Sequence, residues 1–343
     1  MTTLDPYLID PLRLGSDWSG DPLPLAFVDL ADPRLAPPYR LPPFPIIGLG
    51  DHSHPAAGGL DSVVEAPASA TGLIGQVTRN PMAAAAAVQL LRSMDGLPVE
   101  PALTLESFCY AMLQGSAEHR TWLAQRPRDP APVPAGRIEL ARDGDALSVL
   151  IDRSWARNAI DRALRDGLFE AFSIAALDPD LERVSLRSVG PVFSVGADLA
   201  EFGTTSDPAT AFSIRGRTLP ALPLSRRAEI VHVHVQGACV GAGLEMAAFA
   251  GRVTAAPGAW FQLPELAMGL IPGAGGCVSV PRRIGRRRAA LMILSGRRIH
   301  AATALAWGLI DAIQDLPPVD PGGADRDRGK VGAGPVPAAV DQA

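Results

Sequence analysis

Apolar and polar positions follow a helical period between residues 72 and 126. Asn80 stands before Pro81 and an alanine-rich run, an order typical of a helix that begins with a capping residue and a proline. Apolar residues at helical spacing predict a second helix over 99–115, and Ser116 predicts the start of a third. This stretch therefore predicts a compact helical unit.

From residue 137 onward, runs of strand-forming residues alternate with helical patterns. Two such runs flank Asp143-Gly144 and predict a hairpin. Asp161 is a candidate cap for a helix that continues to Phe172. Further strands are predicted at 183–189, 229–235 and 252–256, and further helices at 246–251, 287–296 and 301–313. The alternation predicts an α/β fold.

Proline-rich stretches mark the boundaries between parts of the chain. Residues 1–45 are expected to be an irregular Pro-rich segment, and 127–136 a linker, because both lack hydrophobic periodicity. The helical unit then occupies 46–126 and the α/β core 137–314. Residues 315–343 are rich in Pro, Gly, Asp and Ala and are expected to form a disordered tail.

Composition narrows the classes of function. The 343 residues are 47% hydrophobic and 20% charged, with a net charge of −5, so nothing favours nucleic acid or an anionic membrane as a partner. The only lysine is Lys330, so any phosphate that a cationic side chain of the core contacts must be met by arginine, or by histidine when protonated. The three cysteines form no CxxC pair, and the acidic N-terminus does not resemble a signal peptide. We expect a cytoplasmic protein without a structural zinc site or disulfides.

Four segments rich in glycine or acidic residues follow in order within the core: 193–199 (FSVGADL), 237–245 (GACVGAGLE), 261–265 (FQLPE) and 269–276 (GLIPGAGG). Small residues let backbone N–H groups approach a ligand closely. In the second segment they precede a helix whose free N–H groups favour negative charge. Glu245 shares a helix face with Ala242, although a carboxylate in a first turn also serves as a simple capping group.

The order and spacing of these motifs resemble the crotonase family, the enoyl-CoA hydratase/isomerase superfamily. The resemblance covers about 137–314 and includes Arg157-Asn158-Ala159 and the segment 295–313. It implies a ββα spiral core that binds acyl-CoA thioesters, here joined to a small all-helical unit.

Motif matches also imply roles for single residues. The backbone N–H groups of Ala197 and Ala242 would form an oxyanion hole, and Glu245 and Glu265 would be the catalytic acid and base. Alanine at 242 departs from the family's usual glycine, but only its N–H is needed. The remaining matches imply substrate contacts from Arg157, Ala159, Val195, Gly196, Asp198, Gly241, Pro272 and Gly273.

The resemblance implies no separate cofactor and no metal, because coenzyme A enters as part of the substrate. The family's phosphate-binding lysines are missing, and the arginines at 282, 283 and 286–288 replace them by residue type only; a solvated helix face is the alternative for most of them. His232 and His234 share a strand face and offer two ligands of a conceivable metal site, but no third ligand is placed.

The helical unit resembles the unit with which family members usually end, here placed before the core. The signs are the NP-A start at Asn80, the LxxE pattern in 103–106 and the ending at 116–126. We therefore predict a rearranged order, with an unrelated helical appendage as the alternative. The resemblance also implies a homotrimer or hexamer.

The leading prediction is an enoyl-CoA hydratase-like lyase that adds water to a 2-enoyl-CoA or removes it. Two carboxylates can divide proton removal and proton delivery when their surroundings separate their pKa values. Within the family, double-bond isomerisation, C–C hydrolysis and cofactor-free dioxygenation remain alternatives. Outside enzymes, the alternative is a catalytically idle subunit that binds acyl-CoA.

Overall fold

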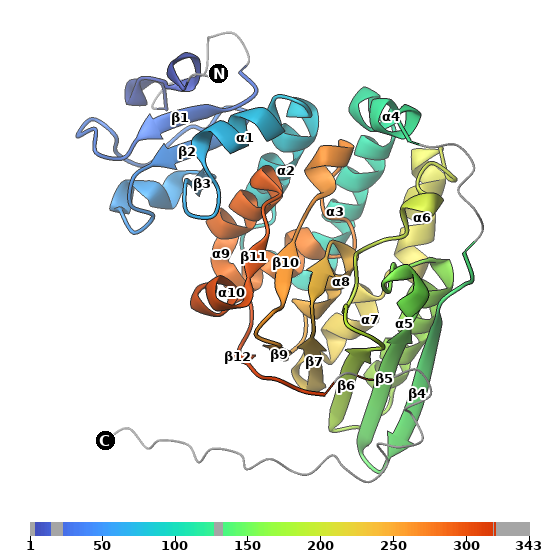
Figure 1. Cartoon of the computed structure of the whole chain (residues 1–343). Coiled ribbons are helices and arrows are strands. Elements are labelled where there is room, and N and C mark those ends of the chain that lie inside the picture. The colour runs from blue at the N-terminus through green and yellow to red at the C-terminus, as the bar shows by residue number, and fades with distance from the viewer. Residues whose placement is uncertain (1–3, 15–22, 127–132, 318, 320–343) are drawn as a thin grey trace, which may run out of the picture.

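The computed structural model describes residues 4–14, 23–126, 133–317 and 319 (Figure 1). The helices are α1 Ala70–Val77, α2 Pro81–Ser93, α3 Val99–Gln114, α4 Ala117–Ala124, α5 Arg162–Leu177, α6 Pro208–Thr218, α7 Ala221–Arg226, α8 Ala242–Ala247, α9 Gly276–Ser295 and α10 Ala301–Trp307. The strands are β1 Ala26–Asp29, β2 Ile46–Leu49, β3 Ser62–Val63, β4 Arg137–Asp143, β5 Ala146–Asp152, β6 Arg183–Ser188, β7 Val231–Val235, β8 Ala238–Val240, β9 Arg252–Ala255, β10 Trp260–Gln262, β11 Ile299–His300 and β12 Ala312–Ile313. Most of the predicted linker and tail lies outside the described residues.

The largest sheet has the order β12-β9-β7-β6-β5-β4. The β4–β5 pair is the predicted hairpin, with Asp143 opposite Ala146 across the turn. All other pairs in this sheet are parallel. Parallel strands need crossover connections, and α5 provides one of them between β5 and β6.

Successive segments build a spiral. The chain adds β7 to the large sheet, β8 to a small second sheet and then forms α8; it next repeats this order with β9, β10 and α9. The small sheet has the order β11-β10-β8. This arrangement is the ββα spiral that the resemblance implies, and the predicted fold class is confirmed.

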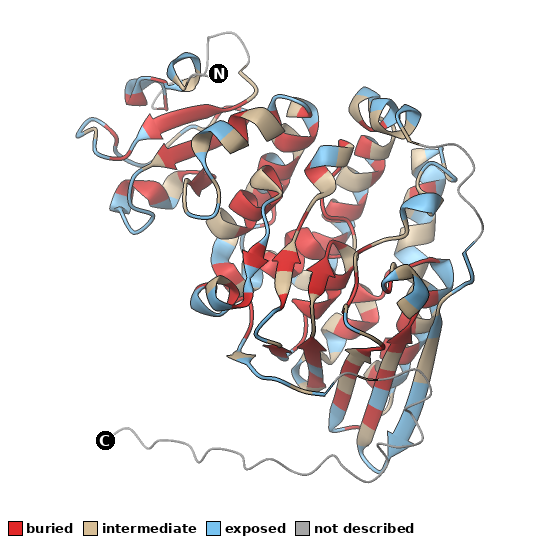
Figure 2. Ribbon diagram, viewed as in Figure 1, coloured by how far each residue is buried: buried red, intermediate tan, exposed pale blue. Residues whose placement is uncertain are grey.

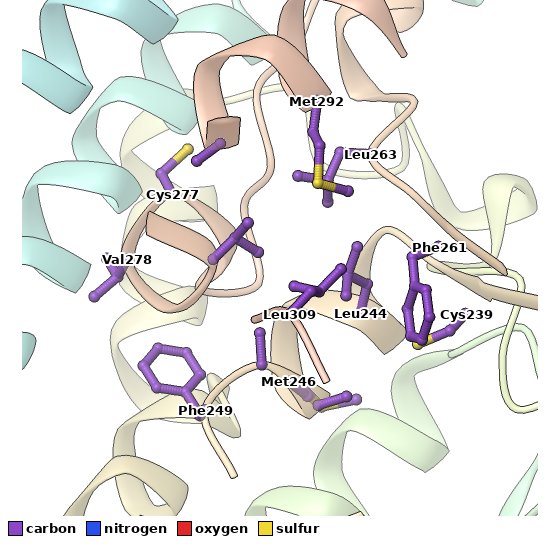
Figure 3. Packing of buried hydrophobic residues seen from close by; sticks show 14 of the residues in the cluster. Cys239, Leu244, Met246, Phe249, Phe261, Leu263, Cys277, Val278, Met292 and Leu309 are labelled. Atoms are coloured by element: carbon purple, nitrogen blue, oxygen red, sulfur yellow. The ribbon is translucent and has the colours of Figure 1, made fainter. Parts of the chain in front are cut away.

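The interior of the spiral is filled by the faces of α8 and α9 that turn toward each other. Figure 3 shows Leu244 and Met246 of α8 close to Leu309, with Cys277 and Val278 of α9 nearby. These side chains are all at most 2% exposed. Figure 2 shows that buried residues continue from here into α2 and α3, so the helical unit and the core share one interior.

The three helices predicted between residues 81 and 126 form, but the first part of the predicted helical unit, 46–63, holds strands β2 and β3 instead. Pro81 is the first residue of α2, and the Ser116 hydroxyl caps α4 by accepting from the His119 N–H at 3.1 Å. Helix α3 packs against α6 and α9. Helices α1, α6 and α7 are not among the predicted elements.

Two parts of the chain differ from the predicted pattern. Strand β1 lies within the segment expected to be irregular, and pairs with β2 in a three-stranded parallel sheet. The strand forms because Phe27 and Val28 are fully buried there, which offsets the lack of a clear sequence period. The predicted helix over 301–313 ends at Trp307, because Gly308 adopts a left-handed conformation and the chain then enters β12.

Among the described residues, no helix combines the length and the apolar character that crossing a bilayer requires.

Candidate active site

A cavity of about 440 Å³ opens where α3, α6, α8 and the loop after β6 meet. Its lining brings together nine residues predicted from separate motifs: Val195, Gly196, Ala197, Asp198, Gly241, Ala242, Glu245, Glu265 and Gly273. The sequence motifs therefore meet in one place although they lie up to 78 positions apart in the sequence.

Buried polar residues hold the loop that carries Ala197 in place, on the side away from the cavity. The Ser194 hydroxyl donates to the Asn158 carbonyl at 2.7 Å and accepts from the Gly196 N–H at 3.1 Å. Arg153, 3% exposed, forms an ion pair with Asp198 at 2.7 Å. Because these buried groups are satisfied within the fold, the loop is held rigidly against the cavity.

Two backbone N–H groups lie on the cavity wall without an internal partner. Within the described residues, neither the Ala197 N–H nor the Ala242 N–H donates a hydrogen bond to protein. Ala242 is the first residue of α8, where helical N–H groups have no acceptor inside the helix. Gly196, with φ +92°, passes so close to the Val240 carbonyl that a Cβ there would lie 3.1 Å from its oxygen. The close passage brings the two N–H groups to the same cavity.

Gly241 allows Glu265 to reach the cavity. Gly241 has φ +47°, a backbone conformation that other residues rarely adopt. A Cβ at this position would lie 2.5 Å from Glu265 Oε1. Glu265 Oε2 is enclosed and has no hydrogen-bond partner among the described residues. One carboxyl oxygen of Glu265 is thus unsatisfied within the described part of the protein.

Glu245 is held by the backbone at the start of α9. Its Oε2 accepts from the Ala274 N–H at 2.6 Å and the Gly276 N–H at 2.8 Å. A side chain at Gly276 would collide with Glu245, so the glycine is required for this approach. These bonds fix Oε2 of Glu245, while Oε1 accepts no hydrogen bond within the described residues.

A second buried glutamate, which the sequence analysis did not predict as a site residue, lies beside Glu245. Glu106 of α3 is 0% exposed, and its two oxygens accept from the Gly275 and Cys277 N–H groups, both at 2.8 Å. The pattern that could have revealed it is a glutamate in line with Leu103 and Tyr110 on a helix face. The LxxE pattern was noted only as a sign of the helical unit.

Burial raises the pKa of all three glutamates. The pKa of Glu245 rises to about 7, because burial outweighs the two N–H bonds and the nearby Arg215 charge that oppose the rise. Burial and the charge of Glu245 raise the pKa of Glu106 to about 8. The same two causes raise the pKa of Glu265 well above its usual range. Of the two glutamates that line the cavity, Glu245 therefore ionises more readily near neutral pH, while Glu265 keeps its proton.

Three predicted contact residues do not line the cavity. Arg157 is exposed, while the Ala159 carbonyl accepts from the buried Arg153 at 2.9 Å. Pro272 is buried, and its carbonyl accepts from the Cys277 thiol. Ala159 and Pro272 thus contribute backbone carbonyls to the support of the site, and the substrate contacts predicted for all three residues stay predictions.

The arginine cluster on α9 makes contacts within the protein. Arg283 donates to the Ala248 carbonyl at 2.9 Å, and Arg288 forms an ion pair with Glu65 at 2.9 Å. Arg287 donates to the His52 carbonyl at 2.8 Å. Much of the cluster thus connects α9 to the N-terminal part of the chain.

Three more residues that the sequence analysis missed line the cavity: Tyr110 and Gln114 of α3, and Arg215 of α6. Since α6 is not a predicted helix, no sequence signal pointed to Arg215. The described residues contain no group of three His, Cys, Asp or Glu side chains placed to hold a metal ion. In particular, the His234 ring bonds to Thr254 at 2.9 Å rather than sharing a site with His232.

A family model described as enoyl-CoA hydratase/isomerase matches residues 144–318, about half of the chain. The chain belongs to the enoyl-CoA hydratase/isomerase family. It is 33% identical over 175 residues to a mevalonyl-coenzyme A hydratase of Beauveria bassiana, covering 49% of this chain and 62% of that one. It is 32% identical over 174 residues to a 2,3-dehydroadipyl-CoA hydratase of Escherichia coli, covering 51% of this chain and 68% of that one.

Among solved structures, an enoyl-CoA hydratase from Thermoplasma volcanium is 33% identical, with a TM-score of 0.46. The match covers 52% of this chain and 72% of that one. This chain spans less than two thirds of the length of the Beauveria bassiana relative. The matched region is the spiral core, which carries Ala197, Ala242, Glu245 and Glu265.

Proposed function

We propose that the protein adds water across the double bond of a 2-enoyl-CoA thioester, or catalyses the reverse dehydration. The observation that carries this proposal is that two glutamates and two partner-free N–H groups line the same cavity. The relatives named as CoA hydratases support the same reaction type.

Each group has a defined step in the reaction. The N–H groups of Ala197 and Ala242 donate to the thioester oxygen, which gains negative charge as water attacks C3. Glu245 takes a proton from the attacking water, whose oxygen forms the new bond to C3. Glu265 delivers a proton to C2, where the electron pair of the double bond arrives. The raised pKa of Glu265 supports its assignment as the acid.

Double-bond isomerisation is the second candidate, because a single base moves a proton between C2 and C4. The presence of Glu265 beside Glu245 in the cavity lining favours hydration over isomerisation, since it supplies a second acid/base group at the site. We expect no separate cofactor for either reaction.

We further propose that residues 46–126 replace the unit with which family members usually end. The contacts of α3 with α9, and of Glu106 with Gly275 and Cys277, support this reading. A variant that carries 46–126 behind residue 317, joined by a flexible linker, should then keep its activity. Loss of folding in that variant would favour an unrelated appendage. Light scattering should give a trimer or hexamer, and a monomer would contradict that expectation.

The test of the reaction is an assay with a panel of short, long and aromatic 2-enoyl-CoAs, in which hydration removes the absorbance of the conjugated thioester. Glu245→Gln and Glu265→Gln keep the size of the side chain and remove its proton chemistry, so both should lose activity by roughly a hundredfold or more. Glu201→Gln is the matched control, because Glu201 also lines the cavity but pairs with Arg162 at 3.8 Å.

Three results would redirect the proposal. Conversion of 3-enoyl-CoA to the conjugated thioester without hydration would indicate an isomerase. Oxygen uptake that depends on acyl-CoA would indicate a dioxygenase. Binding of acyl-CoA without turnover, unchanged in Glu245→Gln, would indicate an idle binding subunit.

A further inference from the structure

One part of the cavity wall is more polar than an unsubstituted acyl chain requires. Beside apolar residues such as Phe202 and Leu219, it presents Tyr110, Gln114 and Arg215. Within the described residues, no hydrogen bond involves the Tyr110 hydroxyl, and Gln114 Oε1 is enclosed without a hydrogen-bond partner. Polar groups of this kind fix the orientation of a ligand in an otherwise apolar pocket.

Arg215 is the charged member of this group. Its guanidinium lies over the Tyr110 ring, with Cζ 4.4 Å from the ring centroid, and its side chain is 16% exposed. Nε and Nη2 are enclosed and make no hydrogen bond within the described part of the chain. A partly buried cation that leaves two nitrogens unbonded pays a desolvation cost that a suitable acceptor would offset.

Glu106 does not supply that acceptor. Arg215 Nη2 lies 3.9 Å from Glu106 Oε1, too far for a hydrogen bond. Both Glu106 oxygens already accept from the Gly275 and Cys277 N–H groups at 2.8 Å. The contact with Glu106 therefore uses none of the donors of Arg215.

Elsewhere in this protein, the same edge of the guanidinium binds carboxylates. Arg288 places Nε and Nη2 at 3.0 and 2.9 Å from the two oxygens of Glu65. Arg34 places them at 3.1 and 2.8 Å from the oxygens of Asp32. This two-pronged geometry is the arrangement for which arginine is best suited. In Arg215 the corresponding edge has no such partner.

We propose that the acyl group of the substrate carries a carboxylate of its own, bound by Arg215 together with the Tyr110 hydroxyl. The inference rests on the proposed function, because it places an acyl-CoA in this cavity. Since Nε and Nη2 are enclosed, the guanidinium turns toward the cavity to meet the ligand. The substrate class is thus a CoA thioester of a dicarboxylic acid.

The test measures binding rather than turnover. Isothermal titration compares succinyl-, glutaryl- and adipyl-CoA with butyryl-, pentanoyl- and hexanoyl-CoA, which are saturated thioesters of matched length that cannot be hydrated. For at least one length, we expect the carboxylate-ended thioester to bind about tenfold tighter or more, as hydrogen bonds between charged groups allow. Arg215→Met should abolish this preference, and Arg215→Lys should keep part of it because the charge remains without the fork.

Arg162→Met is the matched control. Arg162 also lines the cavity but pairs with Glu201 and donates to the Thr204 hydroxyl at 2.6 Å. Its loss should leave the ratio of the two affinities unchanged. If Arg215→Met fails to fold, as thermal melting would show, Arg215→Lys and the wild-type preference still decide the question.

The outcomes separate this inference from the proposed reaction. No preference at any length in the wild type, or a preference that survives in Arg215→Met, overturns the inference. Equal weakening of both ligand series in Arg215→Met would show that Arg215 only balances the buried glutamates, and also overturns it. A preference of the predicted kind, with no hydration of the matching 2-enoyl-CoA, supports the inference and refutes the proposed reaction. If neither series binds, both are refuted.

Discussion

Glu245 and Glu106 accept hydrogen bonds from alternate backbone N–H groups of the same turn, at the start of α9. Glu245 accepts from the N–H groups of residues 274 and 276, and Glu106 accepts from those of 275 and 277. One glutamate comes from the spiral core and the other from the N-terminal helical unit. The position of the proposed base therefore depends on a side chain that lies 139 positions earlier in the sequence.

Replacing Glu106 should disturb the site without removing a reacting group. Glu106→Gln replaces one acceptor oxygen with an amide, so one N–H of the α9 turn loses its partner. We expect the free energy of unfolding to fall by about 1–3 kcal/mol, as measured by urea denaturation. We also expect kcat to fall more than KM rises, because the turn that holds Glu245 loosens.

Glu100→Gln provides the control on the same helix. Glu100 is exposed and pairs with Arg226 on the surface, where such pairs contribute little. If Glu106→Gln behaved like Glu100→Gln in both measurements, the coupling between the helical unit and Glu245 would be refuted.

A methyl group at Gly241 should displace the proposed acid. In Gly241→Ala the new Cβ would lie 2.5 Å from Glu265 Oε1, and the positive φ would be strained by about 1–3 kcal/mol. We expect kcat to fall by roughly a hundredfold. Gly258→Ala should keep full activity, because a Cβ there meets nothing within 4 Å. Normal activity in Gly241→Ala would show that the position of Glu265 does not matter.

The oxyanion-hole role of Ala242 depends on its N–H alone. Ala242→Pro removes that N–H at the first position of α8, where proline is tolerated by helices. We expect kcat to fall by roughly 10²–10³-fold. Ala242→Gly retains the N–H and should stay active. Equal activity in the two variants, measured with folding checked by circular dichroism, would exclude this N–H from the reaction.

The raised pKa values predict the pH dependence. As the proposed base, Glu245 must be a carboxylate, so kcat/KM should rise with pH through about 7 as Glu245 loses its proton. Glu265 must keep its proton, so activity should fall again at higher pH, where burial no longer holds the proton in place. The rising limb should be lost in Glu245→Gln. A rate that is already constant from pH 5 upward would contradict a raised pKa for Glu245.

The sequence predicted the parts of the site that lie in short motifs. Gly241, Ala242 and Glu245 belong to one segment, and their mutual geometry follows from a strand that leads directly into a helix. Glu265 could be predicted from its own motif. The meeting of these motifs follows from the spiral, which stacks successive strand–helix turns upon one another.

Residues that depend on long-range packing could not be predicted. Glu106 reaches the site only because α3 packs against α9, and a glutamate in an amphipathic helix gives no sign of its distant partners. Arg215 lies on α6, whose sequence has no distinct apolar face. Arg157 and Ala159 do not line the cavity, and their carbonyls accept from the Val195 N–H and from Arg153. A motif match cannot distinguish such backbone support from contact with substrate.

The most direct test of the proposed reaction follows the fate of water. The wild-type protein is incubated with a 2-enoyl-CoA in water labelled with oxygen-18, and the thioester is analysed by mass spectrometry. The proposal predicts a 3-hydroxyacyl-CoA heavier than the substrate by one molecule of labelled water, formed in neither Glu245→Gln nor Glu265→Gln. A product of unchanged mass, or labelled product formed equally by both variants, would contradict it.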